Sequence, residues 1–394
     1  MKAVESAPTR DPFALSEEER SVRDTVRDWA AKEVAPGAAE RDEEERYDRS
    51  LFERAGELGL TGLPYPEEYG GAGLGTFAWA LAAEEIGAAD MAMAVSLSVH
   101  ILAELCIFGN GTDEQKERFL PEMTAGRELG AFALTEPQAG SDAASLSLAA
   151  RRDGDDYVLN GTKIWITNAG EAARYIVFAT VDRSKGKAGI TAFVVEADTP
   201  GFRMGSKERK MGIRGTTGYE IVFEDARVPE ANRLGAEGAG LKVALSALGA
   251  GRISIAAACT GLARNALELA ARYALQRRQF DRAIADQEMI QAMLAEMAVG
   301  VDAARLLTWR AARMRDAGQP INAPSSMAKW YASDVAMRVT TDAVQIYGGA
   351  GYSRDNPVER LMRDAKGAQI YEGTNQIHRL IVAQHLLEGL RREA

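Results

Sequence analysis

Histidine and cysteine, which often carry metal and nucleophilic chemistry, are scarce in this chain of 394 residues. The chain contains three histidines and two cysteines, Cys106 and Cys259. No pair among these five residues has the spacing of a zinc site or a C-x-x-C motif, and two cysteines make no disulfide framework. We therefore expect no bound metal and no secreted origin. Any chemistry must come from carboxylates, hydroxyls or a bound cofactor.

One carboxylate stands beside residues that would allow a tight turn. Glu372 directly precedes Gly373 and Thr374. A glutamate in such a position is commonly a helix-end carboxylate, which is the simplest interpretation. In a dry pocket, however, desolvation would raise its pKa toward neutrality and make it a more effective general base. The residues around Glu372 leave both interpretations open.

Several familiar active-site motifs are missing. The chain contains no complete G-x-G-x-x-G, no H-E-x-x-H and no G-x-S-x-G. The segment from Gly235 to Lys242 approaches a P-loop but has Leu241 where the loop needs a lysine. These absences disfavour a Rossmann domain, a P-loop nucleotide site, a zinc protease and a serine esterase.

Helical periodicity dominates the first third of the chain. Ser16 followed by Glu19 forms a capping-box pattern, and apolar residues at helical spacing come after it. Helical patterns return in four further segments, residues 51–58, 77–86, 96–108 and 113–124. We predict an N-terminal helical domain over residues 1–130.

The middle of the chain has the patterns of strands. Asn160-Gly161 between two alternating apolar runs predicts a hairpin within residues 155–167. Further strand-like runs follow, separated by turns rich in Gly, Asp and Pro, in residues 175–181, 190–196 and 219–223. We predict a small antiparallel sheet or barrel that forms a middle β-domain over residues 131–238.

The helical period returns at Gly240 and persists to the end of the chain. A continuous apolar stripe runs from Met289 to Val301, and Gly318 and Pro320 end that helix. Two further helical segments cover residues 334–346 and 376–390. We predict a C-terminal helical bundle domain over residues 239–394 and an α+β fold class that is mostly α.

The charge is negative overall and unevenly distributed. The net charge is −10; residues 1–130 carry 13 Lys or Arg and 27 Asp or Glu, whereas residues 131–394 carry 34 and 30. The acidic first third disfavours a nucleic-acid or anionic-membrane surface there, and the mildly basic remainder would suit an anionic ligand. The N-terminus resembles no signal peptide, and no stretch approaches the 18 or so apolar residues of a membrane span. We expect a cytoplasmic protein.

Four segments together carry a family resemblance. Two lie at the entrance to the predicted sheet, Ala131-Phe-Ala-Leu-Thr-Glu-Pro-Gln-Ala-Gly-Ser-Asp142 and Trp165-Ile-Thr-Asn-Ala169. Two lie in the last helical block, Gln345-Ile-Tyr-Gly-Gly-Ala-Gly-Tyr352 and Ile370-Tyr-Glu-Gly-Thr-Asn-Gln376. In this order and spacing they closely resemble the acyl-CoA dehydrogenases, nearest to the short- and medium-chain members. The resemblance covers the chain from about Leu15 to Leu390.

The resemblance implies the fold, the cofactor and the assembly. It implies an acyl-CoA dehydrogenase-like fold: an N-terminal helical domain, a middle antiparallel β-domain and a C-terminal four-helix bundle. It implies FAD at the junction of the β-domain and the bundle, near a subunit boundary, in a homotetramer. The reaction implied is the oxidation of an acyl-CoA thioester to a trans-2-enoyl-CoA, within fatty-acid β-oxidation.

The resemblance also assigns residues to the cofactor and the substrate. A flavin needs hydrogen bonds around its polar edge and aromatic contact on its ring, and a pyrophosphate needs cations and free amides. The segments at the sheet are expected to line the flavin with Phe132, Leu134, Thr135, Gly140, Ser141, Trp165, Ile166 and Thr167. The residues expected at the dinucleotide part of FAD are Arg277, Gln279, Phe280, Gln287, Gln345, Gly348, Gly349, Thr374, Asn375 and Gln376. The residues expected at the acyl-CoA are Ser141, Arg252, Gly373 and Arg379. Without the resemblance, Trp165 would read as a sheet-core residue.

By resemblance, Glu372 is the catalytic base. Oxidation between the α and β carbons removes an α proton and a β hydride, and the flavin accepts the hydride. Some family members place the base on an earlier helix, where this chain has Gly251, so Glu372 stands alone. Many short-chain members have an Asp at the position of Gly249, and family members usually have Gly where this chain has Asp281. These departures affect the expected CoA contacts and the path of the loop after Phe280.

Several alternatives remain for the electron acceptor and the function class. The loop around Leu74 resembles the region where some members dock electron-transferring flavoprotein, the acceptor that the family implies. An acyl-CoA oxidase that uses O2 is the close enzymatic alternative. A flavin-containing DNA-binding member of the same fold is the other, and the net negative charge weighs against it.

Overall fold

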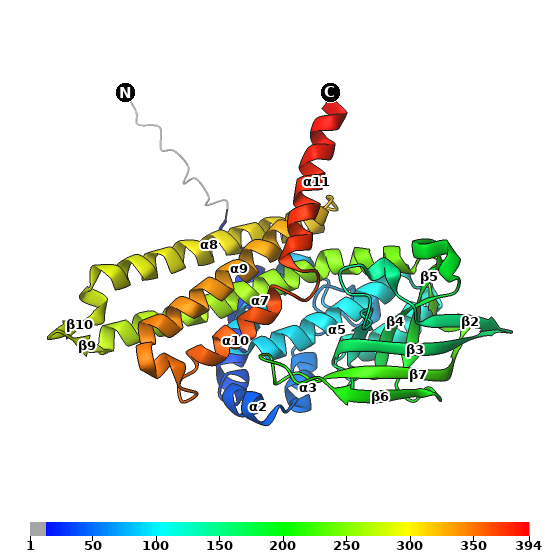
Figure 1. Ribbon diagram of the computed structural model, residues 1–394, viewed down its shortest axis with the longest axis horizontal. Coiled ribbons are helices and arrows are strands. Elements are labelled where there is room, and N and C mark those ends of the chain that lie inside the picture. The colour runs from blue at the N-terminus through cyan, green and yellow to red at the C-terminus, as the bar shows by residue number, and fades with distance from the viewer. Residues whose placement is uncertain (1–12, 394) are drawn as a thin grey trace.

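The computed structural model describes residues 13–393 (Figure 1). The N-terminal region is helical, as predicted, and its first helix begins at Ser16. The Ser16 hydroxyl accepts from the Glu19 amide at 3.1 Å, and the Glu19 carboxylate accepts from the Ser16 amide at 2.8 Å, which completes the capping box. The helices of this region are α1 (Glu17–Trp29), α2 (Ala38–Glu44), α3 (Arg49–Glu57), α4 (Gly75–Ala89), α5 (Met91–Asn110) and α6 (Asp113–Thr124).

An eight-stranded sheet occupies the middle of the described chain, in the order β6-β7-β3-β2-β4-β5-β8, with β1 paired to β4. Most pairs are antiparallel, as predicted, but β1 and β2 each pair with β4 in parallel. The strands are β1 (Gly130–Ala133), β2 (Ala149–Asp153), β3 (Asp156–Thr167), β4 (Arg174–Thr180), β5 (Ile190–Glu196), β6 (Phe202–Lys207), β7 (Gly218–Pro229) and β8 (Arg233–Leu234).

The predicted hairpin at Asn160-Gly161 is wrong. These residues lie inside β3, where the pairing with β7 shifts register between Leu159 and Gly161. The Asn160 amide donates to the Asp225 carboxylate at 3.0 Å and accepts from the Asp225 backbone N–H at 2.9 Å, so the side chain binds the neighbouring strand instead of closing a turn. The hairpin turn lies earlier, at residues 154–155 between β2 and β3.

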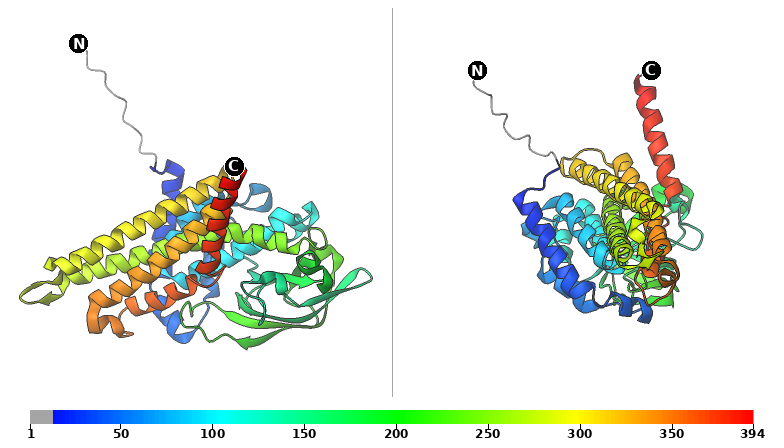
Figure 2. Two further views of the ribbon diagram at one scale, coloured as in Figure 1. Left: turned by 45° about the horizontal axis from the view of Figure 1, so that its top comes forward. Right: turned by 90° about the vertical axis from the view of Figure 1, so that its left-hand side faces the viewer.

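Long helices form the C-terminal region. Three of them, α7 (Gly240–Gln276), α8 (Glu288–Asp316) and α9 (Asn322–Tyr347), run side by side toward a two-stranded tip of β9 (Arg278–Gln279) and β10 (Arg282–Ala283) (Figure 1). The chain returns along α10 (Val358–Ala368) to α11 (Asn375–Glu393), which projects away from the other helices in Figure 1 and in the right-hand view of Figure 2. The predicted order of helices, sheet and helices, and the mostly helical α+β class, are confirmed.

Helix α4 joins the N-terminal helices to the bundle through glycines and buried charges. An added Cβ at Gly261 of α7 would lie 1.8 Å from the Glu84 carbonyl oxygen, so only glycine permits this crossing. The buried Glu85 carboxylate accepts from Arg264 of α7 and from Arg27 of α1, while Arg305 of α8 binds Glu84. Since unpaired buried carboxylates are costly, these pairs fix four helices relative to one another.

Two helices, α5 and α7, are long and apolar enough to cross a membrane by length and composition alone. The prediction that no segment reaches that length is therefore wrong. Most of each apolar stretch is buried inside the protein, because α5 and α7 are the central helices against which the other elements pack. The interpretation of the first eleven residues as lacking a signal peptide falls outside the described residues.

Candidate active site

The loop between α10 and α11 holds Glu372 in an unusual backbone conformation. Glu372 has φ 54° and Gly373 has φ 94°, so two consecutive residues are left-handed. The Tyr371 amide donates to the Gly367 carbonyl at 3.1 Å, and the Asn375 amide donates to the Gln369 carbonyl at 3.1 Å, which closes the loop on both sides. Within residues 13–393 the Glu372 backbone N–H donates to no protein acceptor, so it is available to a ligand. A left-handed glutamate is strained, which is typical of functional sites.

The Glu372 carboxylate is buried without a hydrogen-bond partner. Both of its oxygens are closed off from solvent, and among the described residues neither accepts a hydrogen bond. Burial raises the pKa of Glu372 to about 7, against the opposing effects of the Lys329 and Arg252 charges. A carboxyl group with such a pKa is close to half ionised at neutral pH, which suits a general base. The helix-capping interpretation of Glu372 is therefore wrong.

Gly251 leaves the space that the Glu372 carboxylate occupies. A Cβ built on Gly251 would lie 2.6 Å from Oε2 of Glu372 and 3.2 Å from the Leu102 side chain. No real Cβ contact is that short, so a side chain at residue 251 and a carboxylate at residue 372 compete for one volume. Gly249 lies two residues earlier in α7, and a Cβ built there would have only Ile321 within 4 Å among the described residues, at 3.8 Å.

Three polar groups beside Glu372 were missed in the sequence. Lys329 is fully buried on α9, and its ammonium donates to the Gly373 carbonyl at 2.7 Å and to the Asn375 amide oxygen at 3.2 Å. His378 is buried on α11 with its ring beside Gly373, and the Tyr371 hydroxyl is buried and has no hydrogen-bond partner among the described residues. The sequence did carry a signal for Lys329: it is a lysine among the small residues of a helical apolar stripe, residues 325–336.

Of the residues predicted at the substrate, Arg252 and Gly373 lie beside Glu372. The Arg252 guanidinium is buried and donates to Asn322 at 3.0 Å and to Ser326 at 3.2 Å, while its Nε has no partner in the described part of the chain. Arg379 is exposed and instead pairs with Asp334 at 3.1 Å. Ser141 is exposed in the loop after β1.

The segments predicted at the flavin lie at the sheet edge. Trp165 is 57% exposed and has φ 61°, so the alternative of a sheet-core tryptophan is wrong. A strained backbone that exposes an indole is a costly arrangement, and it fits an aromatic contact for a planar ring. Phe132 packs on Phe178 with ring centroids 5.0 Å apart, and Thr135 and Thr167 are partly exposed. These residues fit a flavin.

A buried ion pair fixes the loop that follows β1. The Lys163 ammonium donates to the Glu136 carboxylate at 2.8 Å and to the Leu134 carbonyl at 3.0 Å. The same carboxylate accepts from the Ser147 and Leu148 amides at 2.7 and 2.9 Å. The loop that carries Thr135, Gly140 and Ser141 is therefore held at both ends.

Three predicted cofactor residues have side chains that the structure uses elsewhere. The Leu134 and Ile166 side chains are buried in the core, so only their backbone can face a ligand. The Asn375 amide is buried, donates to Ser333 and Asp334, and accepts from Lys329. Thr374 accepts from the Ile377 amide at 3.4 Å at the start of α11, and Gln376 is exposed.

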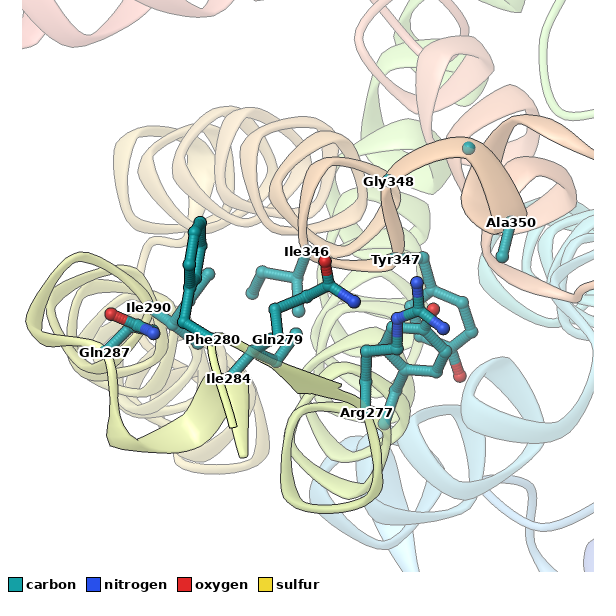
Figure 3. A pocket seen from close by; sticks show the side chains of 12 residues that line it. Arg277, Gln279, Phe280, Ile284, Gln287, Ile290, Ile346, Tyr347, Gly348 and Ala350 are labelled. Carbon is teal, nitrogen blue, oxygen red and sulfur yellow. The ribbon is translucent and has the colours of Figure 1, made fainter. Parts of the chain in front are cut away.

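The remaining predicted cofactor residues line a cavity of about 540 Å³ at the tip of the bundle (Figure 3). Arg277, Gln279 and Phe280 reach it from the end of α7 and β9, and Gln287 from the start of α8 (Figure 3). Its other wall has Tyr347 from α9 followed by the open backbone of Gly348 and Gly349. Exposed Gln345 precedes this wall on α9. A cation beside bare backbone amides fits a pyrophosphate.

The turn at the tip accommodates Asp281 in place of glycine. Gln279 pairs with Arg282 across the turn, and the two residues between them, Phe280 and Asp281, have φ 52° and 63°. Two left-handed residues define a turn that favours Gly or Asn, and Asp is tolerated there. The Arg278 guanidinium donates to the Asp281 carbonyl at 2.5 Å, so the loop path is closed without glycine.

The tip cavity and the Glu372 carboxylate are far apart in one chain. Gly251, beside the Glu372 carboxylate, and Arg277 are separated by 26 residues of the single helix α7, which corresponds to about 39 Å at the rise of an α-helix. The residues predicted for one cofactor thus form two groups at the two ends of α7 (Figure 1).

Comparisons with known proteins match these features to one family along nearly the whole chain. Residues 16–127, 131–226 and 238–387 match the models of the N-terminal, middle and C-terminal domains of acyl-CoA dehydrogenase. An acyl-CoA dehydrogenase of Bacillus subtilis strain 168 is 48% identical over 378 residues, which cover 95% of this chain and 99% of that protein.

Two solved structures are similarly close. Butyryl-CoA dehydrogenase from Megasphaera elsdenii is 44% identical with a TM-score of 0.94, over 96% of this chain and 100% of that chain. A chain in a structure of the electron transferring flavoprotein of Acidaminococcus fermentans is 45% identical with a TM-score of 0.95, over 96% of this chain and 100% of that chain.

Two neighbouring glycines of α7 should respond in opposite ways to alanine. Gly251→Ala places a Cβ against the Glu372 carboxylate, and we expect a loss of about 1–3 kcal/mol in the free energy of unfolding. Gly249→Ala has room for its methyl group and should gain up to about 1 kcal/mol from helix propensity. Denaturant unfolding of both variants measures the difference; equal effects would contradict the shared volume at residues 251 and 372.

Because the pKa of Glu372 is raised, its ionisation should lower the stability of the folded protein as the pH increases. Its pKa is about 7 in the folded protein and 4.5 when unperturbed, so the folded state binds the proton more tightly and stability falls as pH rises through this window. Glu372→Gln carries no charge, so its stability gain over the parent should grow from near zero at pH 4.5 to about 3 kcal/mol above pH 7. Thermal unfolding over this pH range tests it, and a gain independent of pH would contradict the buried charge.

Proposed function

The chain belongs to the acyl-CoA dehydrogenase family, and we propose that it oxidises a short, straight acyl-CoA with Glu372 as its catalytic base. It is an FAD-dependent oxidoreductase of the α,β bond of the acyl thioester, with trans-2-enoyl-CoA as the product. The observation that carries the proposal is the buried Glu372 carboxylate, whose oxygens accept no hydrogen bond from residues 13–393 and whose pKa is raised to about 7.

The residues around Glu372 divide the chemistry among them. The Glu372 carboxylate takes the α proton, and its unused backbone N–H is placed to donate to the thioester oxygen, on which negative charge develops. FAD, when bound, supplies the acceptor for the β hydride. Gly373, left-handed beside the base, lets the backbone approach the thioester closely. The loss of the α proton and the β hydride together leaves the double bond.

One comparison supports a short acyl chain. Butyryl-CoA dehydrogenase, a solved relative at 44% identity, acts on a four-carbon acyl group. The position at Gly249 offers no carboxylate to CoA, so the CoA contacts of this chain differ there from those of relatives with an Asp.

Electron-transferring flavoprotein is the acceptor that we assign. A chain 45% identical to this one is found in a structure of such a flavoprotein, which supports the assignment over O2. The acidic first third of the chain gives no support to a DNA-binding alternative. We further place the enzyme in the cytoplasm and in fatty-acid β-oxidation, and keep the division into domains at residues 130 and 238.

We infer that two copies of the chain build each cofactor site, within a homotetramer. Seven bonds separate the flavin ring from the first phosphorus of FAD, a reach of roughly 10 Å at 1.5 Å a bond. Arg277 lies about 39 Å along α7 from the base, so the Arg277 that binds the pyrophosphate belongs to another copy. Exposed leucines on α11, among them Leu386 and Leu390, supply apolar surface for such an assembly.

The role of Glu372 predicts a separation of binding from chemistry. Glu372→Gln should retain FAD, because the carboxylate contacts no group of the tip cavity. The rate at which a short-chain acyl-CoA bleaches the flavin anaerobically should fall by at least about 10²–10⁴-fold. A panel of straight, branched and aromatic acyl-CoAs gives the substrate range of the parent. Full bleaching by Glu372→Gln would exclude it as the base, and no bleaching of the parent by any acyl-CoA would exclude the function.

The sharing of the site predicts complementation. Arg277→Ala should lose FAD and Glu372→Gln should lose bleaching, so neither assembly is active alone. Mixed assemblies, purified through a different tag on each variant, contain sites with an intact base from one copy and an intact arginine from the other. We expect these assemblies to regain a fraction of the parent bleaching amplitude. An inactive mixed assembly would place both residues of one site in the same chain.

A further inference from the structure

Lys329 carries a buried charge in an unusual setting. Its side chain is fully buried on α9, and within residues 13–393 no carboxylate oxygen lies within 4.0 Å of its ammonium. Its two partners are neutral, the Gly373 carbonyl at 2.7 Å and the Asn375 amide oxygen at 3.2 Å. A buried ammonium without an anion in contact is costly, and proteins seldom retain one without a function.

The partners of Lys329 both follow Glu372, one in the loop that holds the base and one at the start of the next helix. Gly373 directly follows Glu372, and both residues are left-handed. Asn375 begins α11 and is fixed from the other side by Ser333 at 2.9 Å and Asp334 at 2.8 Å. The ammonium therefore bridges the strained residues to the first turn of the next helix.

The titratable groups that face Glu372 come from several elements. Helix α7 presents Arg252 and Cys259, helix α11 presents His378, the loop itself presents Tyr371, and helix α9 presents Lys329. Helix α5 contributes the apolar Leu102. Burial lowers the pKa of His378 to about 3 and raises those of Cys259 and Tyr371, so these three groups are neutral near pH 7.

The two cations near the base differ in what they hold. Arg252 binds Asn322 and Ser326 on the neighbouring helix and was expected at the substrate. Lys329 instead binds the backbone of the loop that holds Glu372. The acid on the same helix is Asp334, whose carboxylate accepts hydrogen bonds from Trp330, Gln369, Asn375 and Arg379. Burial lowers the pKa of Lys329 to about 8, so it stays mostly charged at pH 7.

We propose that Lys329 is a positioning residue for the base: its ammonium holds the Gly373 carbonyl and the left-handed loop, and it places a positive charge beside the Glu372 carboxylate. This inference rests on the proposed role of Glu372. The ammonium is hydrogen-bonded to the carbonyl of the residue after Glu372, and its charge opposes the rise in the Glu372 pKa that burial causes. Among residues 13–393 the Glu372 oxygens accept no hydrogen bond, so the carboxylate keeps its lone pairs for the α proton.

Two substitutions separate the charge from the hydrogen bond. Lys329→Gln removes the charge but keeps a donor for the Gly373 carbonyl, and Lys329→Met removes both. Ser333→Ala is the matched control, because it removes a neutral contact to Asn375 one helical turn away. Anaerobic flavin bleaching by a short-chain acyl-CoA, followed from pH 5.5 to 9, gives the midpoint of the acid limb for each variant.

The expected result is a shift with a defined sign. Loss of the positive charge makes ionisation of Glu372 harder, so the midpoint should rise by about one pH unit in both Lys329 variants. Lys329→Met should also lose rate at high pH, because the loop is no longer held, whereas Ser333→Ala should keep the parent midpoint. If Lys329→Gln lowers the rate equally at all pH values with the parent midpoint, the inference is overturned.

A second measurement does not depend on activity. The stability difference between the parent and Glu372→Gln reports the protonation of Glu372 by its pH midpoint, in purified protein without substrate. In a Lys329→Gln background this midpoint should rise by the same amount, and an unchanged midpoint would overturn the inference. If no acyl-CoA bleaches the parent, the proposed function fails, but this midpoint still decides whether Lys329 sets the charge of Glu372.

Discussion

The burial of one unpaired carboxylate is the constraint around which this site is built. An ionised carboxylate without hydrogen bonds is expensive in a dry interior, and a direct salt bridge would lower its pKa and make it a weak base. In this structure two cations partly offset the effect of burial on the Glu372 pKa. Arg252 and Lys329 face Glu372 closely enough to oppose the effect of burial, yet their donors are directed to Asn322, Ser326 and the Gly373 carbonyl. The carboxylate stays near half ionisation and its oxygens stay free.

The frame that maintains this arrangement lies outside the site. The strained Glu372–Gly373 backbone persists only because α7, α9 and α11 are fixed around it. Glycines let α4 cross α7 at backbone contact, and the buried Glu84 and Glu85 bind arginines of α1, α7 and α8. The buried Lys163–Glu136 pair does the same for the loop after β1. The buried carboxylates of the frame, Glu84, Glu85 and Glu136, are thus paired with cations. The Glu372 carboxylate, where chemistry is expected, accepts no hydrogen bond from the described residues.

The helical frame was predictable, whereas the site was predictable only in part. Apolar periodicity and the Ser16 capping box identified most helices because those signals are local. The hairpin at Asn160-Gly161 failed, because the Asn160 side chain binds Asp225 on a strand 65 residues away. Glu372 emerged from a family resemblance; nothing local in its sequence distinguishes a base from a capping residue. Lys329 was missed because its meaning depends on a loop 44 residues later.

The two groups of residues predicted at the cofactor are kept apart by α7, the same long helix that packs beside Glu372. Because α7 is one unbroken helix from Gly240 to Gln276, the Gly251 end and the Arg277 end cannot approach each other by any local motion. Within one chain, Glu372 therefore lies far from Arg277, the cation that we propose for the pyrophosphate. The apolar face of α11, which begins directly after the base loop, is uncovered in the same chain. The first turn of α11, where Asn375 binds Lys329, therefore connects this exposed face to the loop that holds Glu372.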